Sequence, residues 1–354
     1  MSERLMIYGA YGYSGELIAR EAVARGLEPI LAGRRPEPLD ALAHELGCES
    51  RPFQLDTGPI VERRLEDVAV VLHCAGPFST TFRPMVEGCL AARTHYLDIT
   101  GEIDVLESLA RRDAAAREAG VVLLPAVGFD VVPTDCLAVF LAEQLPDADR
   151  LEIAIQALGR LSRGTTRTMI ENLGRPGRVR RGGALVDAAL LEHTRRVDFG
   201  DGERDCVAIP WGDLATAYRS TGIGDITVYA AMSGRQRFGL RLASWFGWLL
   251  GSRPVQAFLK SRVDPGGPSE QQRSAGRSTV WARVERQDGE AREALLTGPE
   301  GYAWTTRLAV DAAERVLAAH RAGDGSLATG FQTPGKLFGA DFVLGEGVER
   351  RGRG

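Results

Sequence analysis

Short apolar runs alternate with longer amphipathic stretches over the first third of the chain. Val105–Ala119, rich in Ala, Glu and Arg and followed by Gly120, is typical of a helix. Two shorter helices, Glu16–Arg25 and Leu39–Leu46, are each followed by a glycine as well. Strands that alternate with helices predict a doubly wound α/β fold, a parallel sheet with crossover helices. The six predicted strands are Leu5–Tyr8, Pro29–Ala32, Arg51–Leu55, Val68–His73, Thr94–Leu97 and Val121–Ala126.

The pattern changes beyond residue 130. Segments in which apolar and polar residues alternate replace the earlier succession of short strands and helices. Leu151–Ala157 alternates like a half-buried strand, and Asp201-Gly202 and Asp288-Gly289 lie between alternating segments, as hairpin turns do. These features predict an α+β domain with a mixed or antiparallel sheet. The C-terminal residues Glu349–Gly354 are expected to form a frayed tail.

The chain is therefore divided into two domains. Residues 1–130 form the predicted Rossmann domain. Residues 131–354 form the predicted α+β domain, which would hold the substrate or a second subunit. Within it, residues 325–345 are expected to pack back on the first domain.

The first predicted strand leads directly into a glycine-rich loop with the spacing Gly-x-x-Gly-x-x-Gly. This spacing, between a strand and a helix, is typical of a dinucleotide-binding turn. The glycines permit close approach of the backbone, and the amides at the helix start face the pyrophosphate. A merely structural turn is the alternative. The candidate cofactor residues of the loop are Gly9, Tyr11, Gly12, Tyr13, Ser14 and Gly15.

The end of the second strand predicts which dinucleotide binds. An NAD site places Asp or Glu there, about 20 residues beyond the loop, to hold the ribose hydroxyls. This chain has Arg34 and Arg35 instead, which suit the 2′-phosphate of NADP(H); the alternative is solvated surface charge. Asp56, after the third strand, would accept from the adenine amino group or cap the turn at Thr57.

The fourth strand ends beside the first in a doubly wound sheet, where the nicotinamide half should lie. Small residues there let the backbone approach the cofactor, and a proline stiffens the exit. The candidate contacts are Ala75, Gly76, Pro77 and Phe78.

Hydride transfer requires a proton donor close to the nicotinamide. Glu102 follows the fifth strand and Asp130 the sixth, so both carboxylates should lie at the carboxyl end of the sheet. In the second domain, Tyr218 could donate a proton and Arg219 could hold a substrate carboxylate or thioester oxygen. Structural roles, such as capping of the following turn by Asp98, are the alternative for residues of this kind.

Residues 236–262 carry aromatic and leucine side chains flanked by arginines. A basic amphipathic segment with tryptophans suits a peripheral membrane contact, an entrance for a lipid-like substrate or a homodimer seam. A buried core helix with snorkelling arginines is the alternative. The longest uncharged apolar stretch, Leu242–Gly251, is half of the ~20 residues that a spanning helix needs.

Composition narrows the function classes. The chain has 354 residues, a net charge of -4 and a sequence pI of about 5.9, values that argue against nucleic acid as a partner. Its cysteines and histidines show no zinc-site spacing, so no metal is expected. Only eight residues precede Gly9, which leaves little room for a presequence and favours a cytoplasmic protein.

Several segments together resemble the saccharopine dehydrogenase-like reductases, and within them the trans-acting enoyl reductase branch. They are GAYGYSG (9–15), LAGRR (31–35), CAGPF (74–78), THYLDITGE (94–102), GFDVVPTD (128–135) and GFQTP (330–334). The family more often has Thr where this chain has Tyr11 and Ser14, and Ser where it has Val131. The resemblance implies an NADP(H)-binding Rossmann domain, a second α+β domain and reduction of a C=N or C=C bond.

Three functional hypotheses follow from the sequence. The first is an NADPH-dependent oxidoreductase that reduces a C=C or C=N bond of a hydrophobic substrate such as an acyl chain. The second is a saccharopine-type C–N oxidoreductase acting on an amino-acid conjugate. The third is a non-catalytic NADP(H)-binding scaffold, because a fold does not imply an activity.

Overall fold

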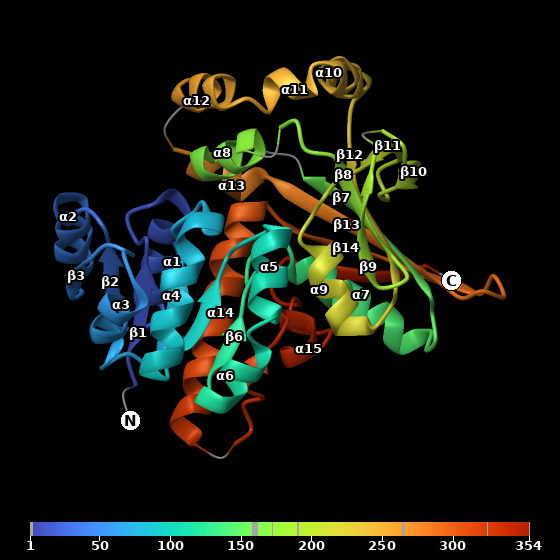
Figure 1. The fold of residues 1–354 in the computed structure, drawn as a ribbon. Coiled ribbons are helices and arrows are strands. Elements are labelled where there is room, and N and C mark those ends of the chain that lie inside the picture. The colour runs from blue at the N-terminus through green and yellow to red at the C-terminus, as the bar shows by residue number, and fades with distance from the viewer. Residues whose placement is uncertain are drawn as a thin grey trace. The chain divides into compact units, whose positions relative to one another are not determined.

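A computed structural model describes residues 3–157, 162–171, 173–189, 191–263, 266–323 and 325–353 (Figure 1). The chain forms two compact units. Unit 1 contains Met1–Val132 and Tyr302–Leu337, and unit 2 contains Pro133–Gly301 and Phe338–Gly354. None of the helices in the described ranges combines the length and the hydropathy needed to cross a membrane.

Unit 1 is built on a parallel seven-stranded sheet in the order β15-β6-β5-β4-β1-β2-β3. This confirms the predicted doubly wound sheet. Strands β1, β2, β4 and β5 are buried at every position, as expected of a parallel sheet covered on both faces. The strands are β1 (Leu5–Tyr8), β2 (Ile30–Gly33), β3 (Ser50–Pro52), β4 (Val70–His73), β5 (His95–Asp98), β6 (Val122–Leu124) and β15 (Gly330–Phe331).

Glycines end three of the helices in unit 1. Gly26, Gly47 and Gly120 all have positive φ, the left-handed conformation that stops a helix at little cost. The helices are α1 (Tyr13–Ala24), α2 (Pro36–Leu46), α3 (Gly58–Leu65), α4 (Phe78–Ala92), α5 (Ile103–Ala110), α6 (Asp113–Ala119), α14 (Gly301–Ala322) and α15 (Pro334–Phe338).

Two predictions for this unit need correction. The single helix predicted over Val105–Ala119 is two helices, because the chain leaves helical geometry at Arg112, which has φ -96° and ψ 7°. The division at residue 130 also differs from the compact units, since Tyr302–Leu337 lies in unit 1. In that segment β15 adds a parallel strand beside β6, and Arg25 of α1 pairs with Asp311 of α14 at 2.6 Å.

Two histidines join the sheet of unit 1 to α14. The Nδ1 of His95 accepts from the Val122 amide at 3.1 Å, so its Nε2 carries the proton and donates to His320 Nδ1 at 3.0 Å. Burial, followed by the neighbouring His320, lowers the pKa of His95 to about 4. The folded protein therefore holds His95 neutral at pH values where the unfolded chain takes up a proton.

The free energy of unfolding should consequently fall as the pH drops from about 6.5 to about 4. The contribution of His95 at the acid end is on the order of 3 kcal/mol. H95N keeps an acceptor for the Val122 amide but cannot titrate. Urea unfolding should show that the stability difference between the wild type and H95N shrinks over this range, whereas H44N, at an exposed position of α2, serves as control. A constant difference would contradict the assignment.

Unit 2 has a mixed sheet of nine strands, in which β8 and β9 form a hairpin off the path β10-β11-β12-β7-β13-β14-β16, and β8 pairs with β12. Strands β12 and β7 are parallel and the other pairings are antiparallel. The predicted hairpins at Asp201-Gly202 and Asp288-Gly289 are confirmed. The strands are β7 (Arg150–Ala157), β8 (Gly177–Arg181), β9 (Ala184–Ala188), β10 (Thr194–Asp198), β11 (Glu203–Ala208), β12 (Asp225–Ala231), β13 (Arg277–Glu285), β14 (Ala291–Pro299) and β16 (Glu349–Arg353).

The prediction of a frayed C-terminal tail is wrong. Strand β16 pairs with β14 from Glu349 to Arg353. Arg350 anchors this strand, because its guanidinium lies 3.8 Å from the ring centroid of Phe140 and pairs with Asp341 at 2.6 Å. The helices of unit 2 are α7 (Val132–Gln144), α8 (Arg163–Glu171), α9 (Asp213–Thr221), α10 (Gly234–Trp245), α11 (Gly247–Leu250), α12 (Arg253–Ser261) and α13 (Glu270–Ala275).

Candidate functional site

The glycine-rich loop forms a tight turn between β1 and α1. Gly9 has φ +85°, and its amide donates to the carbonyl of Ala32 on β2 at 2.8 Å. A Cβ atom at Gly15 would lie 2.2 Å from the carbonyl oxygen of Gly9, so a side chain cannot fit there without moving the backbone. The third glycine thus brings the start of α1 directly against the turn.

The start of α1 is arranged to receive an anion. Its N-cap is Gly12, which has no side chain to accept from the first amides of the helix. Tyr13 and Ser14 begin the helix, and the Tyr13 ring packs edge-on against Tyr302 of α14 at 5.1 Å. The positive end of the helix dipole and its backbone N–H groups suit the pyrophosphate of a dinucleotide.

Tyr11 and Arg35 meet at the end of β2. The Arg35 amide donates to the Tyr11 hydroxyl at 3.3 Å, and the Arg35 guanidinium lies 4.9 Å from the centroid of the Tyr11 ring. Gly33 makes room for that ring, because a Cβ atom there would lie 2.6 Å from it. Arg34 and Arg35 are exposed between β2 and α2, as a 2′-phosphate contact requires. Asp56 is exposed in the segment between β3 and α3, and its role stays a prediction.

The segment between β4 and α4 lies against the glycine loop. A Cβ atom at Gly9 would lie 2.8 Å from the Ala75 amide nitrogen, and the Gly76–Pro77 peptide is cis. Thr81 of α4 donates to the Ala75 carbonyl at 2.7 Å and lies 3.0 Å from the Nε2 of His73. Thr81 is not among the residues predicted from the sequence. Its contact with Ala75 depends on how α4 packs against the loop that precedes it, and no local motif indicates this packing.

Glu102 supports the same segment from the neighbouring loop. One of its carboxylate oxygens accepts from the Phe78 amide and the other from the Ser79 amide, both at 2.9 Å. A negative charge at this position caps the start of α4. With both oxygens accepting, Glu102 fits a positioning residue for the Ala75–Phe78 segment better than a proton donor.

Asp98 links the loops that follow β5 and β6. It is fully buried and accepts from the amides of Thr100 and Ala126 at 2.9 and 2.8 Å and from the Tyr96 hydroxyl at 2.6 Å. Burial outweighs these hydrogen bonds and raises the pKa of Asp98 to about 6. The expected capping of the turn by Asp98 is therefore confirmed. The hydrogen bond from the Ala126 amide to Asp98 was not predicted from the sequence.

Asp130 lies where the loops after β5 and β6 meet. A Cβ atom at Gly101 would lie 3.0 Å from its Oδ2, so the glycine leaves space for the carboxyl group. Burial raises the pKa of Asp130 to about 6. The loop before it is supported by α14, where Thr305 accepts from the Phe129 amide at 3.0 Å.

The other two candidates lie in unit 2, on α9. The ring of Tyr218 is stacked under the guanidinium of Arg180, 4.4 Å from the ring centroid. Arg219 donates to the carbonyl of Ala215, one turn earlier on its own helix, at 2.8 Å. Their assignment to substrate binding or proton transfer stays a prediction.

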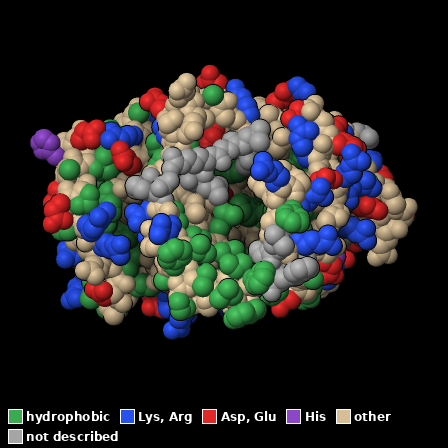
Figure 2. Space-filling view, turned by 90° about the horizontal axis from the view of Figure 1, so that it is seen from above, with side chains coloured by type: hydrophobic (Ala, Val, Ile, Leu, Met, Phe, Trp, Pro, Cys, Tyr) green, Lys and Arg blue, Asp and Glu red, His purple; other side chains and the backbone are tan. Residues whose placement is uncertain are grey.

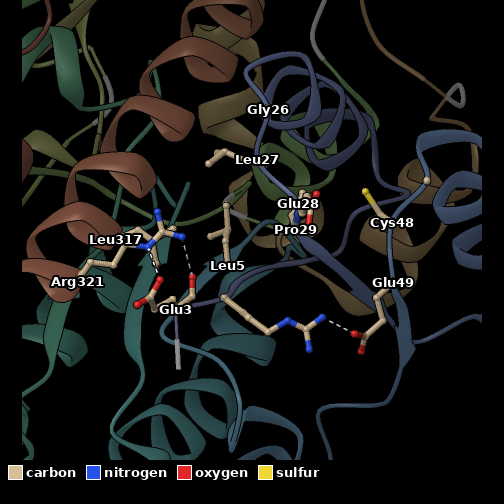
Figure 3. A pocket seen from close by; sticks show the side chains of 12 residues that line it. Glu3, Leu5, Gly26, Leu27, Glu28, Pro29, Cys48, Glu49, Leu317 and Arg321 are labelled. Atoms are coloured by element: carbon tan, nitrogen blue, oxygen red, sulfur yellow. Dashed lines mark hydrogen bonds and ion pairs between the residues drawn. The ribbon is translucent and has the colours of Figure 1, made fainter. Parts of the chain in front are cut away.

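A cavity of about 600 Å³ lies at the opposite end of the sheet in unit 1 (Figure 3). Leu5 and Pro29 line it at the amino ends of β1 and β2, and the ion pairs Arg4–Glu49 and Arg321–Glu3 cross its wall. Doubly wound sheets bind their ligands at the carboxyl ends of the strands, so this cavity is distinct from the candidate cofactor site. Within the described ranges, no group of three or more His, Cys, Asp or Glu could hold a metal ion.

Comparison with known proteins supports the cofactor assignment for unit 1. The family model for the saccharopine dehydrogenase NADP binding domain matches residues 5–124. A probable mitochondrial saccharopine dehydrogenase-like oxidoreductase of Arabidopsis thaliana is 32% identical over 160 residues, 40% of this chain and 35% of the relative. Trans-acting enoyl reductase of Mycobacterium ulcerans is 33% identical over 141 residues, 37% of this chain and 33% of the relative. The chain thus covers about a third of the length of these relatives.

The whole chain shares its fold with solved structures. Apo saccharopine dehydrogenase (L-Glu forming) from Saccharomyces cerevisiae matches with a TM-score of 0.67 at 14% identity, over 99% of this chain and 100% of that one. Homospermidine synthase from Legionella pneumophila, in complex with NAD, matches with a TM-score of 0.65 at 9% identity, over 98% and 91%. Unit 1 is therefore an NADP-binding Rossmann domain, and the matches at low identity establish the fold of the rest.

Proposed function

We propose that this chain, whose residues 5–124 belong to the saccharopine dehydrogenase NADP-binding domain family, is an NADPH-dependent oxidoreductase that reduces a C=C or C=N bond of a hydrophobic substrate. One observation carries the proposal. At the carboxyl end of a single parallel sheet, the chain combines a glycine-rich loop, exposed arginines after β2 and a partly buried carboxyl group, Asp130, with a raised pKa. Relatives named trans-acting enoyl reductase favour a C=C bond of an acyl chain as the first substrate to test.

The residues of unit 1 would divide the work of binding and proton transfer. NADPH supplies the hydride when it is bound. The amides at the start of α1 would hold the pyrophosphate, Arg34 and Arg35 would hold the 2′-phosphate, and the segment after β4 would border the nicotinamide. Asp130 would donate a proton to the atom of the substrate double bond that does not take the hydride. Solvent would then return a proton to the carboxylate.

Asp130 suits this proton transfer better than Glu102. Its pKa of about 6 keeps part of the carboxyl protonated close to neutral pH, which favours donation. Glu102 already accepts two amide hydrogens at the start of α4, so both of its oxygens are engaged in holding that helix start. Glu102 follows β5 and Asp130 follows the neighbouring strand β6, so a variant of one carboxylate serves as a control for a variant of the other.

Replacement of Asp130 by Asn should lower kcat by about 100-fold, because it removes the proton donor, and leave the Kd for NADPH within about threefold. In the wild type, kcat should fall as the pH rises above about 6, since the protonated fraction of Asp130 falls. D130N should lose this pH dependence. E102Q should keep the pH dependence while weakening NADPH binding, because only the segment after β4 is disturbed. A pH profile flattened by E102Q instead would move the donor role to Glu102.

The substrate class is tested on the full-length chain by following NADPH oxidation. One series contains 2-enoyl thioesters of increasing chain length, and the other contains imines of amino-acid conjugates. We expect kcat/KM to rise with acyl chain length as apolar surface is buried, by about 3-fold to 4-fold per added CH₂ in the binding region. Turnover of the imines alone would establish the C–N alternative. NADPH binding without turnover of any compound would contradict an enzyme of this class and favour a scaffold.

A further inference from the structure

Three consecutive helices of unit 2 expose most of the large hydrophobic side chains found at the surface of the described chain. Phe238 of α10, Trp248 of α11 and Phe258 of α12 are 64%, 79% and 58% exposed. Phe246 and Leu249 lie between them and are also exposed. Figure 2 looks down on these helices, which run along the top of Figure 1, and hydrophobic side chains gather in that view. The exposed side chains of residues 233–263 are called the basic aromatic surface below.

The expected alternative of a core helix does not hold for α12. None of the residues from Arg253 to Ser261 is buried. The helix is attached to α8 through polar contacts instead, since Lys260 pairs with Glu171 at 2.9 Å. Its apolar residues therefore remain available to an external partner. The side chains of Leu242 and Trp245, which the sequence had also assigned to this surface, lie outside the described residues.

The charge of the segment has one sign. Residues 233–263 contain six arginines and lysines and no Asp or Glu, although the whole chain has a net charge of -4. Arg237 pairs with Asp205 at 2.7 Å and Lys260 with Glu171. Four of the six are exposed, namely Arg235, Arg241, Arg253 and Arg262. Exposed aromatic side chains thus lie among exposed cations.

This combination favours a lipid surface over a second copy of the chain. A two-fold contact through this surface would bring a segment with cations and no acidic residues against its own copy, and like charges repel. An anionic bilayer offers the opposite charge to the arginines and a boundary between headgroups and acyl chains that suits tryptophan and phenylalanine. We propose that the basic aromatic surface binds peripherally to an anionic lipid bilayer. This binding is independent of the proposed oxidoreductase activity.

The test is co-sedimentation of the full-length protein with vesicles of phosphatidylcholine alone or with about 30% phosphatidylserine, a typical source of negative surface potential. Binding should be at least about 30-fold tighter to the anionic vesicles. It should weaken as NaCl rises from about 0.1 M to about 1 M, where screening shortens to a few ångströms. No binding to anionic vesicles, or equal binding to both kinds, would overturn the proposal.

Matched variants separate the contribution of the aromatic side chains to lipid binding from that of the cations. W248S should weaken binding by about 10-fold to 100-fold because it removes an inserted aromatic side chain. V186S is its control, since Val186 on β9 is an exposed hydrophobic residue outside the surface. R253Q/R262Q should weaken binding by about 30-fold, and R63Q/R111Q, at exposed positions of unit 1, should not.

Two further measurements make the test of lipid binding independent of the proposed oxidoreductase activity. Circular dichroism and urea unfolding check that each variant is folded, whether or not the protein turns over a substrate. Light scattering without lipid measures the oligomeric state. A wild-type dimer that W248S dissociates, with no vesicle binding, would assign the surface to self-association and contradict the proposal. Equal losses of vesicle binding for W248S and V186S would also contradict it.

Discussion

Replacement of Gly15 by Ala should destabilise the protein by about 3 kcal/mol or more and raise the Kd for NADPH by about 100-fold or more. The added Cβ atom would lie 2.2 Å from the carbonyl oxygen of Gly9 and 2.9 Å from its carbon. These are backbone atoms of the turn, so no side chain can rotate away and α1 must move from the loop. Urea unfolding and NADPH titration measure the two effects.

Gly239 provides the matched control, because it also lies within a helix, α10, and an added Cβ there would meet nothing within 4 Å beyond its chain neighbours and the backbone of its own helix. G239A should be neutral or stabilise the protein by up to about 1 kcal/mol, as alanine favours a helix. NADPH binding should not change. Similar losses in G15A and G239A would show that close packing at Gly15 does not explain the effect.

Replacement of both Arg34 and Arg35 by Ala should raise the Kd for NADPH by about 100-fold and leave the Kd for NADH within about threefold. The two guanidiniums are exposed after β2, and they are the cations there that can pair with a 2′-phosphate, which NADH lacks. Because the site is open to solvent, the preference of the wild type should weaken at high salt. Competitive titrations with both nucleotides measure the change.

R63A/R111A removes the same charge from exposed positions of unit 1 and should leave both affinities unchanged. Equal weakening of NADPH and NADH in R34A/R35A would contradict the assignment to the 2′-phosphate. It would instead indicate that Arg35, through its amide contact and stacking with Tyr11, holds the loop in shape for either nucleotide.

The fold of the first 130 residues was predictable because its signals are local. Strands such as Leu5–Tyr8 are short apolar runs, and helices such as α2 end at a glycine with positive φ. The two-residue strand β15 and the return of α14 to unit 1 could not be predicted in this way. Strand β15 pairs with β6, about 200 positions earlier, and α14 contacts α1 through Arg25 and Asp311, 286 positions apart. Contacts over such separations leave no periodic pattern in either segment.

The residues of the candidate site also fall into two groups, those that local motifs predict and those whose roles depend on tertiary contacts. The glycine loop and the arginines after β2 are contiguous motifs, and their chemistry follows from residue type and position in the strand order. The roles of Glu102 and Asp98 depend on which amides their oxygens reach, at Phe78 and at Ala126. Those contacts connect different loops and are fixed by tertiary packing. Sequence could place these carboxylates at the correct end of the sheet but could not separate support from proton transfer.

Parallel titration of the full-length wild-type protein with NADPH and NADH, followed by nicotinamide fluorescence, tests the cofactor site most directly. The loop between β1 and α1 and the arginines after β2 predict saturable binding of NADPH, at least about tenfold tighter than that of NADH. Binding of neither nucleotide, or tighter binding of NADH, would contradict an NADPH site at the carboxyl end of this sheet.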